Sequence, residues 1–301
     1  MSPTVFVTSA TGTQGGSLVR KLRDVGWDVH TTVRDPTSPA AQALLNLGVT
    51  ILPGDWDDET SLAAALSGCQ KLFLNLFPDF RDPSIELKRA KTILSLARSA
   101  GVEQVIYSSD FALEADDAES LVGKIRQSKR NIEEVIRSAG FDTWTIVRPG
   151  FFMANFVLPK VHMYPGALEG VYTLPYPGDT LLPLIDHEDI GKFAAAVFET
   201  PDKFHGQTIR IAGDVISVED VLKSLSRVSG RNIRGIYLSK EEIEERGKSD
   251  LYIAGQVVVT QMAGLVKIDE VKSWGVPFGT FTNFLEREEA LVRTTYRDAP
   301  I

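Results

Sequence analysis

The sequence lacks the features that mark several classes of protein. It has a single cysteine, Cys69, in 301 residues, so no disulfide can form within the chain, and we expect a reducing compartment, the cytoplasm. No apolar run approaches the roughly 18–20 residues that a membrane-spanning helix needs. The first residues carry no basic stretch of the kind that opens a signal peptide. We therefore expect a protein that is neither secreted nor embedded in a membrane.

The sequence also has fewer basic residues than acidic ones. The chain has 32 Lys and Arg against 40 Asp and Glu, which gives a net charge of −8. The densest basic cluster, residues 124–130, follows a helical pattern, so we expect it to face solvent. The four histidines also lack the spacing of metal ligands. These absences predict no direct nucleic-acid surface and no metal site.

What the chain does have is a glycine-rich turn near its start. An apolar run, Val5-Phe6-Val7, leads into Ser9-x-x-Gly12-x-x-Gly15, and an amphipathic segment with Leu18, Val19 and Leu22 follows. A strand, a turn of small residues and a helix in that order favour phosphate binding, because the helix N-terminus presents unpaired N–H groups. The alternative is an ordinary turn between a strand and a helix that binds no ligand.

The N-terminal half then alternates between predicted strands and predicted helices. This alternation is typical of an α/β fold with a Rossmann-like, doubly wound parallel sheet, whose ligand lies at the carboxyl ends of the strands. We expect strands at residues 27–33, 49–52, 71–76, 104–108 and 143–147, and helices at 40–47, 60–66, 84–100 and 120–139.

The alternation stops after Phe152. A stretch rich in proline and glycine follows, and the later elements are shorter. We expect two domains, an NAD(P)-binding domain over 1–152 and a smaller C-terminal α/β lobe over 153–301, with the chain free to cross back between them. The lobe is expected to form the wall of the substrate site. Its expected elements are 182–185, 192–199, 207–212, 218–228 and 235–238.

The end of the second strand, Val33-Arg34-Asp35, predicts the choice of dinucleotide. An acid at this point bonds the ribose 2′-hydroxyl of NAD, whereas an arginine pairs with the 2′-phosphate of NADP. Because Arg34 comes first, we expect NADP(H) to be favoured over NAD(H). Asp35 leaves NAD binding open, and an Arg34 that merely ends the strand in solvent is the alternative.

Further motifs span most of the chain. Beside the turn at residues 10–16 and Val33-Arg34-Asp35, they are Gly54-Asp55, residues 105–109, Lys129 with Glu133, residues 145–155 and Asp189-Ile190-Gly191. Together they resemble the NmrA-like family of atypical short-chain dehydrogenases/reductases, which is akin to isoflavone-reductase-like enzymes. The resemblance implies a Rossmann-like NAD(P) domain. It covers both NADPH-dependent reductases and regulators that bind the dinucleotide without turning it over.

The strand ends and the resemblance together give a set of expected cofactor contacts. We expect the turn, the ends of the next strands and two later residues to line the dinucleotide. The set is Ser9, Thr11, Gly12, Thr13, Gln14, Gly15, Arg34, Asp55, Trp56, Asn75, Leu76, Phe77, Lys129 and Asn155.

Two departures from the family pattern matter for chemistry. Ser9 stands where the first glycine is usual, so the turn must tolerate a Cβ there. Ile125 stands four residues before Lys129, where short-chain reductases have the tyrosine that exchanges a proton. Isoflavone-reductase-like enzymes resemble this chain in relying on the lysine alone. Lys129 is therefore the leading catalytic candidate, and an exposed ion pair with Glu133 is the alternative.

Other polar residues are weaker candidates, each with a structural alternative. Ser108 and Ser109 are expected to bond a substrate carbonyl or their own turn. A tyrosine of the irregular stretch is expected to replace the missing proton donor or simply to pack. Asp189 is expected to cap the next helix rather than to pair with His187. The tyrosines are Tyr164, Tyr172 and Tyr176.

Three functions fit these residues. The leading one is an NADPH-dependent reductase that passes a hydride to a small or medium apolar substrate. The second is a redox sensor that binds NADP(H) and acts through a protein partner, as the missing tyrosine suggests. The third is a redox-neutral isomerase or lyase on the same scaffold.

Overall fold

The computed structural model describes residues 2–111 and 119–301. Contacts divide the chain into two compact units, which are described separately below. Unit 1 comprises residues 1–148 and 190–209, and unit 2 comprises residues 149–189 and 210–301. The predicted ranges, 1–152 and 153–301, differ because residues 190–209 return to unit 1, a crossing that the prediction allowed.

Unit 1 is built on a seven-stranded sheet in the order β10-β6-β5-β4-β1-β2-β3. The pairs from β6 to β3 are all parallel. The order 3-2-1-4-5-6 within it is that of a doubly wound dinucleotide-binding sheet, which confirms the predicted fold class. The strands are β1 (Thr4–Val7), β2 (Asp28–Val33), β3 (Thr50–Pro53), β4 (Lys71–Leu74), β5 (Gln104–Ser108), β6 (Thr143–Pro149) and β10 (Gln207–Ile211).

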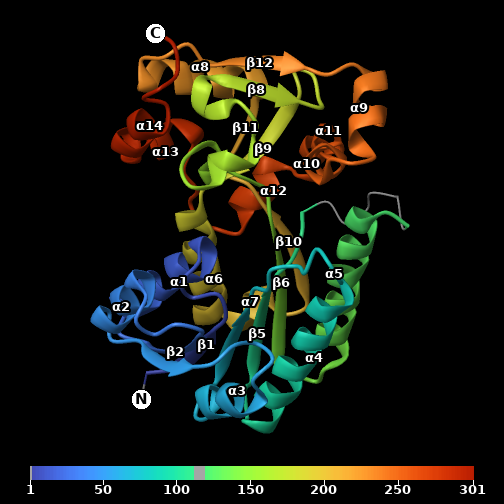
Figure 1. Ribbon diagram of the computed structural model, residues 1–301. Helices are drawn as coiled ribbons and strands as arrows, with labels where there is room; N and C mark the ends of the chain where they lie inside the picture. The colour runs from blue at the N-terminus through green and yellow to red at the C-terminus, as the bar shows by residue number, and fades with distance from the viewer. Residues whose placement is uncertain (1, 112–118) are drawn as a thin grey trace. The chain divides into compact units, whose positions relative to one another are not determined.

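Helices cover both faces of this sheet (Figure 1). One face carries α3, α4 and α5, whose apolar residues pack with Phe6, Leu72 and Tyr107 in a single core cluster. Helices α1 and α6 lie together, so closely that a Cβ on Gly191 would meet Ser17 Oγ at 2.3 Å. The helices are α1 (Thr13–Asp24), α2 (Pro39–Asn46), α3 (Glu59–Leu66), α4 (Ser84–Ser99), α5 (Leu121–Ser138), α6 (His187–Glu199) and α7 (Pro201–Phe204).

Local sequence explains these boundaries. Strand β5 has the predicted bounds, because its five consecutive residues are all buried. Helix α1 buries Leu18, Val19 and Leu22, the predicted apolar face. Cys69 packs in the core, and burial raises the pKa of its thiol to about 12.

Unit 2 has two small sheets and many short helices. One sheet has the order β11-β9-β7, and the other pairs β12 with β8. The strands are β7 (Phe151–Phe152), β8 (Val171–Leu174), β9 (Leu181–Ile185), β11 (Asp214–Ser217) and β12 (Arg234–Tyr237). The α-helices are α8 (Val218–Ser229), α9 (Lys240–Gly247), α10 (Leu251–Gln256), α11 (Val259–Met262), α12 (Ile268–Ser273), α13 (Phe281–Arg287) and α14 (Glu289–Thr295), and the 3₁₀ turns are η1 (Met153–Phe156), η2 (Lys160–Met163), η3 (Ala167–Glu169) and η4 (Ala263–Leu265).

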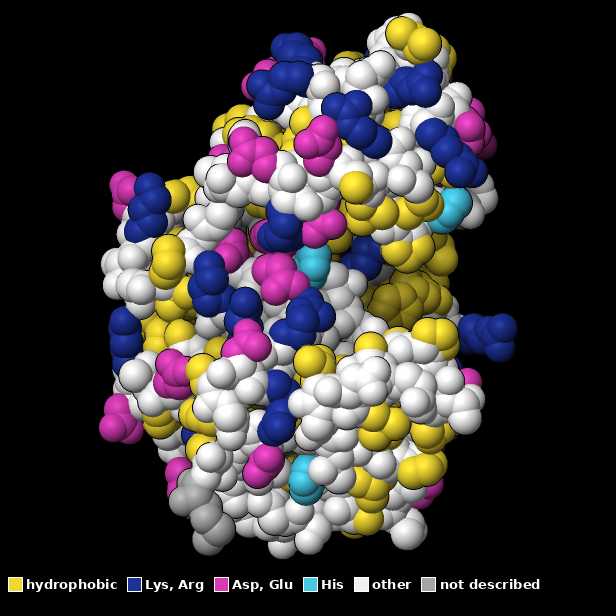
Figure 2. Space-filling view, turned by 90° about the vertical axis from the view of Figure 1, so that its left-hand side faces the viewer, with side chains coloured by type: hydrophobic (Ala, Val, Ile, Leu, Met, Phe, Trp, Pro, Cys, Tyr) yellow, Lys and Arg dark blue, Asp and Glu magenta, His cyan; other side chains and the backbone are white. Residues whose placement is uncertain are grey.

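The surface mixes charges of both signs. On the face drawn in Figure 2, basic side chains are interspersed with acidic ones. Across the residues that the structure describes, no helix combines the length and the apolar character needed to cross a bilayer.

Candidate functional site

The glycine-rich turn between β1 and α1 is held by hydroxyl groups. Ser9 is the only non-glycine residue with a positive φ, +52°, within residues 2–111 and 119–301. Its Oγ donates to the carbonyl oxygen of Asn75 at 2.8 Å, and Thr8 Oγ1 donates to the same oxygen at 3.0 Å. The expectation that this turn tolerates a Cβ at position 9 is confirmed, because a short polar side chain adopts the left-handed conformation and anchors it.

The glycines of the turn allow the helix to begin against the strand. A Cβ on Gly15 would lie 2.4 Å from the carbonyl oxygen of Ser9 and 2.9 Å from that of Thr8. Gly12 is the N-cap of α1 and has no side chain to cap it, and the first helical turn holds no acidic residue. The N–H groups at this helix N-terminus are therefore left for an anion, and no local negative charge repels it.

A cleft of about 780 Å³ opens beside this turn in unit 1. It contains seven of the residues that the sequence predicted for the cofactor, and it adds others from the ends of β2 and β3 and from α4. The predicted ones are Ser9, Thr11, Gly12, Arg34, Asp55, Trp56 and Phe77; the others are Ala10, Thr32, Val33, Asp35, Ser38, Gly54, Pro78, Asp79 and Arg89.

Several predicted contacts do not line this cleft. Gln14 accepts a hydrogen bond from Ser108 Oγ at 2.7 Å, and Leu76 is buried. Asn75 is tied through its backbone to Thr8 and Ser9. Their roles at the cofactor, and those of Thr13, Lys129 and Asn155, stay predictions.

The two charged residues that follow β2, Arg34 and Asp35, differ in the hydrogen bonds that they already make within the protein. Among the described residues Arg34 makes no hydrogen bond or ion pair, and its side chain is exposed in the cleft. Asp35 Oδ1 accepts from the N–H of Thr37 at 2.9 Å and from its hydroxyl at 2.6 Å, and these bonds lower the pKa of Asp35. The arginine is thus available to a ligand, whereas the acid is turned onto its own loop.

Replacing Thr37 by valine should remove the hydroxyl bond to this carboxylate and leave only the backbone N–H bond. We expect Thr37→Val to raise the affinity for NADH relative to NADPH by roughly two- to tenfold, because Asp35 can then accept from a ribose 2′-hydroxyl. Calorimetric titration with both dinucleotides measures the ratio. Thr294→Val, an exposed threonine on α14, is the control. An unchanged ratio in Thr37→Val contradicts the role given to Thr37.

Helix α4 also contributes a residue to the cleft, which sequence reasoning missed. Arg89 lines the cleft and donates from Nε to Asp57 Oδ1 at 3.0 Å, with a second bond between Nη2 and Oδ2. Its guanidinium carbon lies 6.0 Å from the ring centroid of Trp56. The pair gives the cleft a planar, polar face beside an aromatic ring. Asp58 is the N-cap of α3 and accepts from the N–H of Ser61 at 3.0 Å.

Lys129 is buried rather than exposed, so the alternative, an exposed ion pair with Glu133, is wrong. Its ammonium donates to Glu86 Oε1 at 2.7 Å, and only 9% of the residue is exposed. Glu133 is instead bonded by Arg148 and Arg137. The i,i+4 rule failed because α5 packs against α4, which brings Glu86 to the lysine (Figure 1). Ile125, the position of the missing tyrosine, is also buried.

The two serines at the end of β5 have different surroundings. Ser108 bonds Gln14 across the site rather than its own turn. Ser109 donates its backbone N–H to Val147 at 2.8 Å, and its hydroxyl is buried near Tyr107 and Glu133. Their expected contact with a substrate carbonyl stays a prediction.

The tyrosines of unit 2 form its core. All three predicted tyrosines are 2% exposed or less, so the expectation that they pack is confirmed. Tyr172 bonds Tyr296, which donates to the carbonyl oxygen of Phe156 at 2.5 Å. Burial raises the pKa of each well above its ordinary value, which makes it a poor proton donor. Asn155, in η1, interacts with the hydroxyl of Tyr164 and opposes part of the rise in its pKa.

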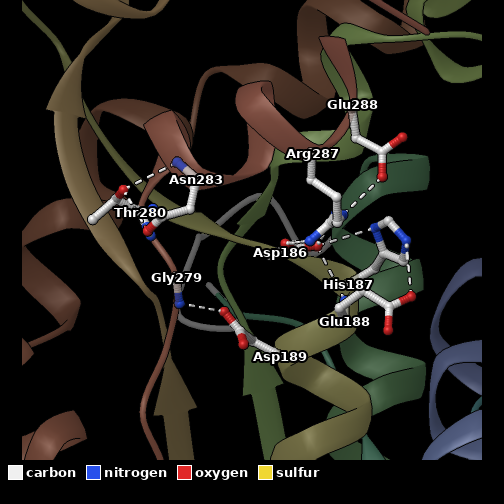
Figure 3. Close-up of polar contacts among 9 residues, drawn as sticks. All are labelled: Asp186, His187, Glu188, Asp189, Gly279, Thr280, Asn283, Arg287 and Glu288. Carbon is white, nitrogen blue, oxygen red and sulfur yellow. Dashed lines mark hydrogen bonds and ion pairs between the residues drawn. The ribbon is translucent and has the colours of Figure 1, made fainter. Parts of the chain in front are cut away.

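The start of α6 differs from the prediction (Figure 3). The helix begins at His187, so Asp189 lies inside its first turn and is not the N-cap. Asp189 Oδ2 instead accepts from the N–H of Gly279 at 2.6 Å. His187 does not pair with Asp189: its Nδ1 lies 3.3 Å from Asp186 Oδ1, and Arg287 also binds Asp186. Burial lowers the pKa of His187 despite these acidic neighbours.

Comparisons with known proteins agree with this architecture. The family model of the NmrA-like family matches residues 1–273. The chain is 31% identical over 78% of its length to the NmrA-like family domain-containing oxidoreductase malD of Malbranchea aurantiaca, of which the match covers 75%.

Two solved structures share the fold. The NADPH-dependent quinone oxidoreductase QOR2 of Escherichia coli, complexed with NADPH, has a TM-score of 0.74 at 23% identity, with 94% of this chain and 99% of that chain covered. The negative transcriptional regulator NmrA, in complex with NAD, has a TM-score of 0.74 at 22% identity, with 98% and 96% covered. By sequence and by fold, the chain belongs to the NmrA-like family.

Proposed function

We propose that this protein is an NADP(H)-dependent oxidoreductase. Reduced nicotinamide, when bound, supplies a hydride, and we propose that the acceptor is a small or medium apolar organic molecule. The similarity to malD and to QOR2 supports oxidoreductase chemistry in general. The observation that carries the choice of dinucleotide is the contrast between Arg34, which has no partner among the described residues, and Asp35, which Thr37 already binds.

The residues of the cleft divide into roles along the dinucleotide. The turn and the start of α1 present N–H groups to the pyrophosphate. Arg34 pairs with the 2′-phosphate, because a guanidinium binds phosphate through charge-assisted, bidentate hydrogen bonds. Trp56 and Arg89, which line the same cleft, offer faces against which the adenine base would stack.

Removing Arg34 tests the preference. We expect Arg34→Ala to weaken NADPH binding by about 1.5–3 kcal/mol and NADH binding much less, because only NADPH carries the phosphate that the arginine pairs with. Calorimetric titration of the variant with each dinucleotide measures both losses. Arg297→Ala, which removes an exposed arginine that pairs with its neighbour Asp298, should leave both affinities unchanged. An equal loss of affinity for both dinucleotides would contradict the assignment of Arg34 to the 2′-phosphate.

Lys129 is the residue that we propose acts at the nicotinamide end. It lies on α5, which follows β5, four residues after Ile125, the position of the missing tyrosine. We propose that it bonds the ribose and gives a proton to the oxygen of the reduced substrate. Loss of the lysine should then reduce turnover of an identified substrate.

A redox sensor is the second candidate. Its support is the missing tyrosine at Ile125 and the similarity in fold to a transcriptional regulator. A sensor must bind one oxidation state more tightly than the other, since a signal enters only as a difference in binding free energy. Consumption of NADPH that depends on an added substrate argues against it.

A further inference from the structure

Glu86 and Lys129 form an ion pair inside unit 1. Glu86 lies in the first turn of α4, where the helix N-terminus favours a carboxylate, and it is 1% exposed. Lys129 reaches it from α5 at 2.7 Å. A buried ion pair adds little to stability on balance, because removing two charges from water costs about as much as their attraction returns. The pair therefore calls for an explanation beyond holding α4 against α5.

The second carboxylate oxygen of Glu86 is left open. Glu86 Oε2 is buried and accepts no hydrogen bond from the residues that the structure describes. The hydroxyl of Tyr107, on β5, is likewise buried without a hydrogen bond of normal geometry. Burial first, and then the negative charge of Glu86, raise the pKa of Tyr107 well above its ordinary value. Buried polar atoms without a hydrogen bond are uncommon in folded proteins. Two of them in one cluster are a destabilising feature of the kind that functional sites retain.

Glu133 provides a contrast within the same layer of helices. It is as buried as Glu86, but Arg148 bonds both of its oxygens at 2.9 and 2.8 Å, and Arg137 adds a bond at 2.9 Å. Burial alone would raise its pKa, yet these arginines bring the pKa of Glu133 below its ordinary value. Both oxygens of Glu133 are therefore bonded, whereas Glu86 has a single partner, Lys129, among the described residues.

The charges around Glu86 come from three elements. Lys129 faces it from α5, and Asp110 acts on it from the segment after β5, with Tyr107 on the strand itself. Arg126, also on α5, lies 3.9 Å from Asp110. Burial raises the pKa of Glu86, and Lys129 is the group that opposes this rise. The dependence is mutual, because a buried ammonium is also unfavourable without its counter-charge.

We propose that Glu86 is the positioning residue for Lys129, fixing its ammonium at one point and keeping it charged for the cofactor and the substrate. The proposal rests on the function proposed above. When Lys129 gives up a proton, its N–H bond breaks and an O–H bond forms on the substrate anion that hydride addition creates. The resulting amine recovers a proton from solvent, and the carboxylate of Glu86 favours that recovery.

The pH dependence of NADPH binding tests the proposal. The dissociation constant of NADPH is measured by calorimetry from pH 6 to pH 9.5 for the wild type and for Glu86→Gln, with circular dichroism confirming the fold at each pH. We expect Glu86→Gln to bind NADPH within about threefold of the wild type at pH 6 and roughly tenfold or more weakly at pH 9, because burial disfavours an ammonium that has no counter-charge and one charge-assisted bond to the cofactor is then lost. Glu86→Asp should restore part of the affinity at pH 9.

Glu133→Gln is the matched control. It removes an equally buried carboxylate from α5, so it should lower stability while its NADPH binding follows the pH profile of the wild type. A Glu86→Gln protein that folds and also follows the wild-type profile overturns the proposal. If Glu86→Gln does not fold, Glu86→Asp decides the matter, since a shorter carboxylate must weaken binding at pH 9 more than at pH 6. A wild type that binds no NADPH would instead overturn the proposed function.

Discussion

Replacing Gly15 by alanine is expected to abolish dinucleotide binding. The new Cβ would lie 2.4 Å from the carbonyl oxygen of Ser9, and neither that backbone nor the buried strand β1 can move aside cheaply. Helix α1 must therefore shift away from β1, and its N–H groups no longer aim at the pyrophosphate. We expect NADPH affinity to fall more than about a hundredfold, because two or more charge-assisted bonds of roughly 1.5–3 kcal/mol each are misaligned at once.

The same variant should also be less stable. Overfilling a packed interior costs about 1–3 kcal/mol, and urea unfolding measures this loss while calorimetry measures the binding. Gly247→Ala is the control, since a Cβ there meets nothing within 4 Å and the residue lies in a helix, α9. A Gly15→Ala protein that binds NADPH like the wild type contradicts the assignment of this turn to the pyrophosphate.

Replacing Lys129 by alanine is expected to be costly even without any substrate. The change leaves the carboxyl of Glu86 buried and unpaired, and breaking one side of a buried ion pair typically costs about 3–5 kcal/mol. Urea unfolding at pH 8 should show a loss of this size. Replacing Glu86 by glutamine in the same protein should recover part of it, because no charge then remains buried.

The loss should depend on pH in a definite direction. Burial holds the pKa of Glu86 above its ordinary value in the folded state, and Lys129 is the first group that opposes this rise. Without the lysine the folded state therefore binds a proton that the unfolded state has released, so stability falls as pH rises through that window. The deficit of Lys129→Ala should be smaller at pH 5 than at pH 8. Equal deficits at both values contradict the account of the Glu86–Lys129 pair.

Much of the architecture could be predicted from the sequence, because local patterns specify it. Apolar runs between turn residues mark β1 and β5, and the spacing of Leu18, Val19 and Leu22 marks the buried face of α1. The ligand edge of a parallel sheet lies at the strand ends, so the positions of Arg34, Asp55, Trp56 and Phe77 in the sequence predict that they line the cleft.

What the sequence could not predict depends on packing between elements. Nothing in the pattern of α4 indicates that Arg89 enters the cleft or that Glu86 meets Lys129, because both contacts depend on how α4 lies against α3 and α5. The i,i+4 spacing instead favoured Glu133 as the lysine's partner. The predicted N-cap of α6, Asp189, is likewise wrong. Its carboxylate accepts a hydrogen bond from the backbone N–H of Gly279, ninety residues away in the chain.

The central claim is that this cleft binds NADP(H), and titration of the purified protein with NADPH, NADP⁺, NADH and NAD⁺ by calorimetry tests it most directly. The account predicts that NADPH and NADP⁺ bind and that both NAD forms bind more weakly, since only the former carry the phosphate for Arg34. Tighter binding of NADH than NADPH would contradict the assignment of Arg34 and Asp35. Binding of none of the four would mean that Ser9 has closed the turn to phosphate, and the proposed function would fail with it.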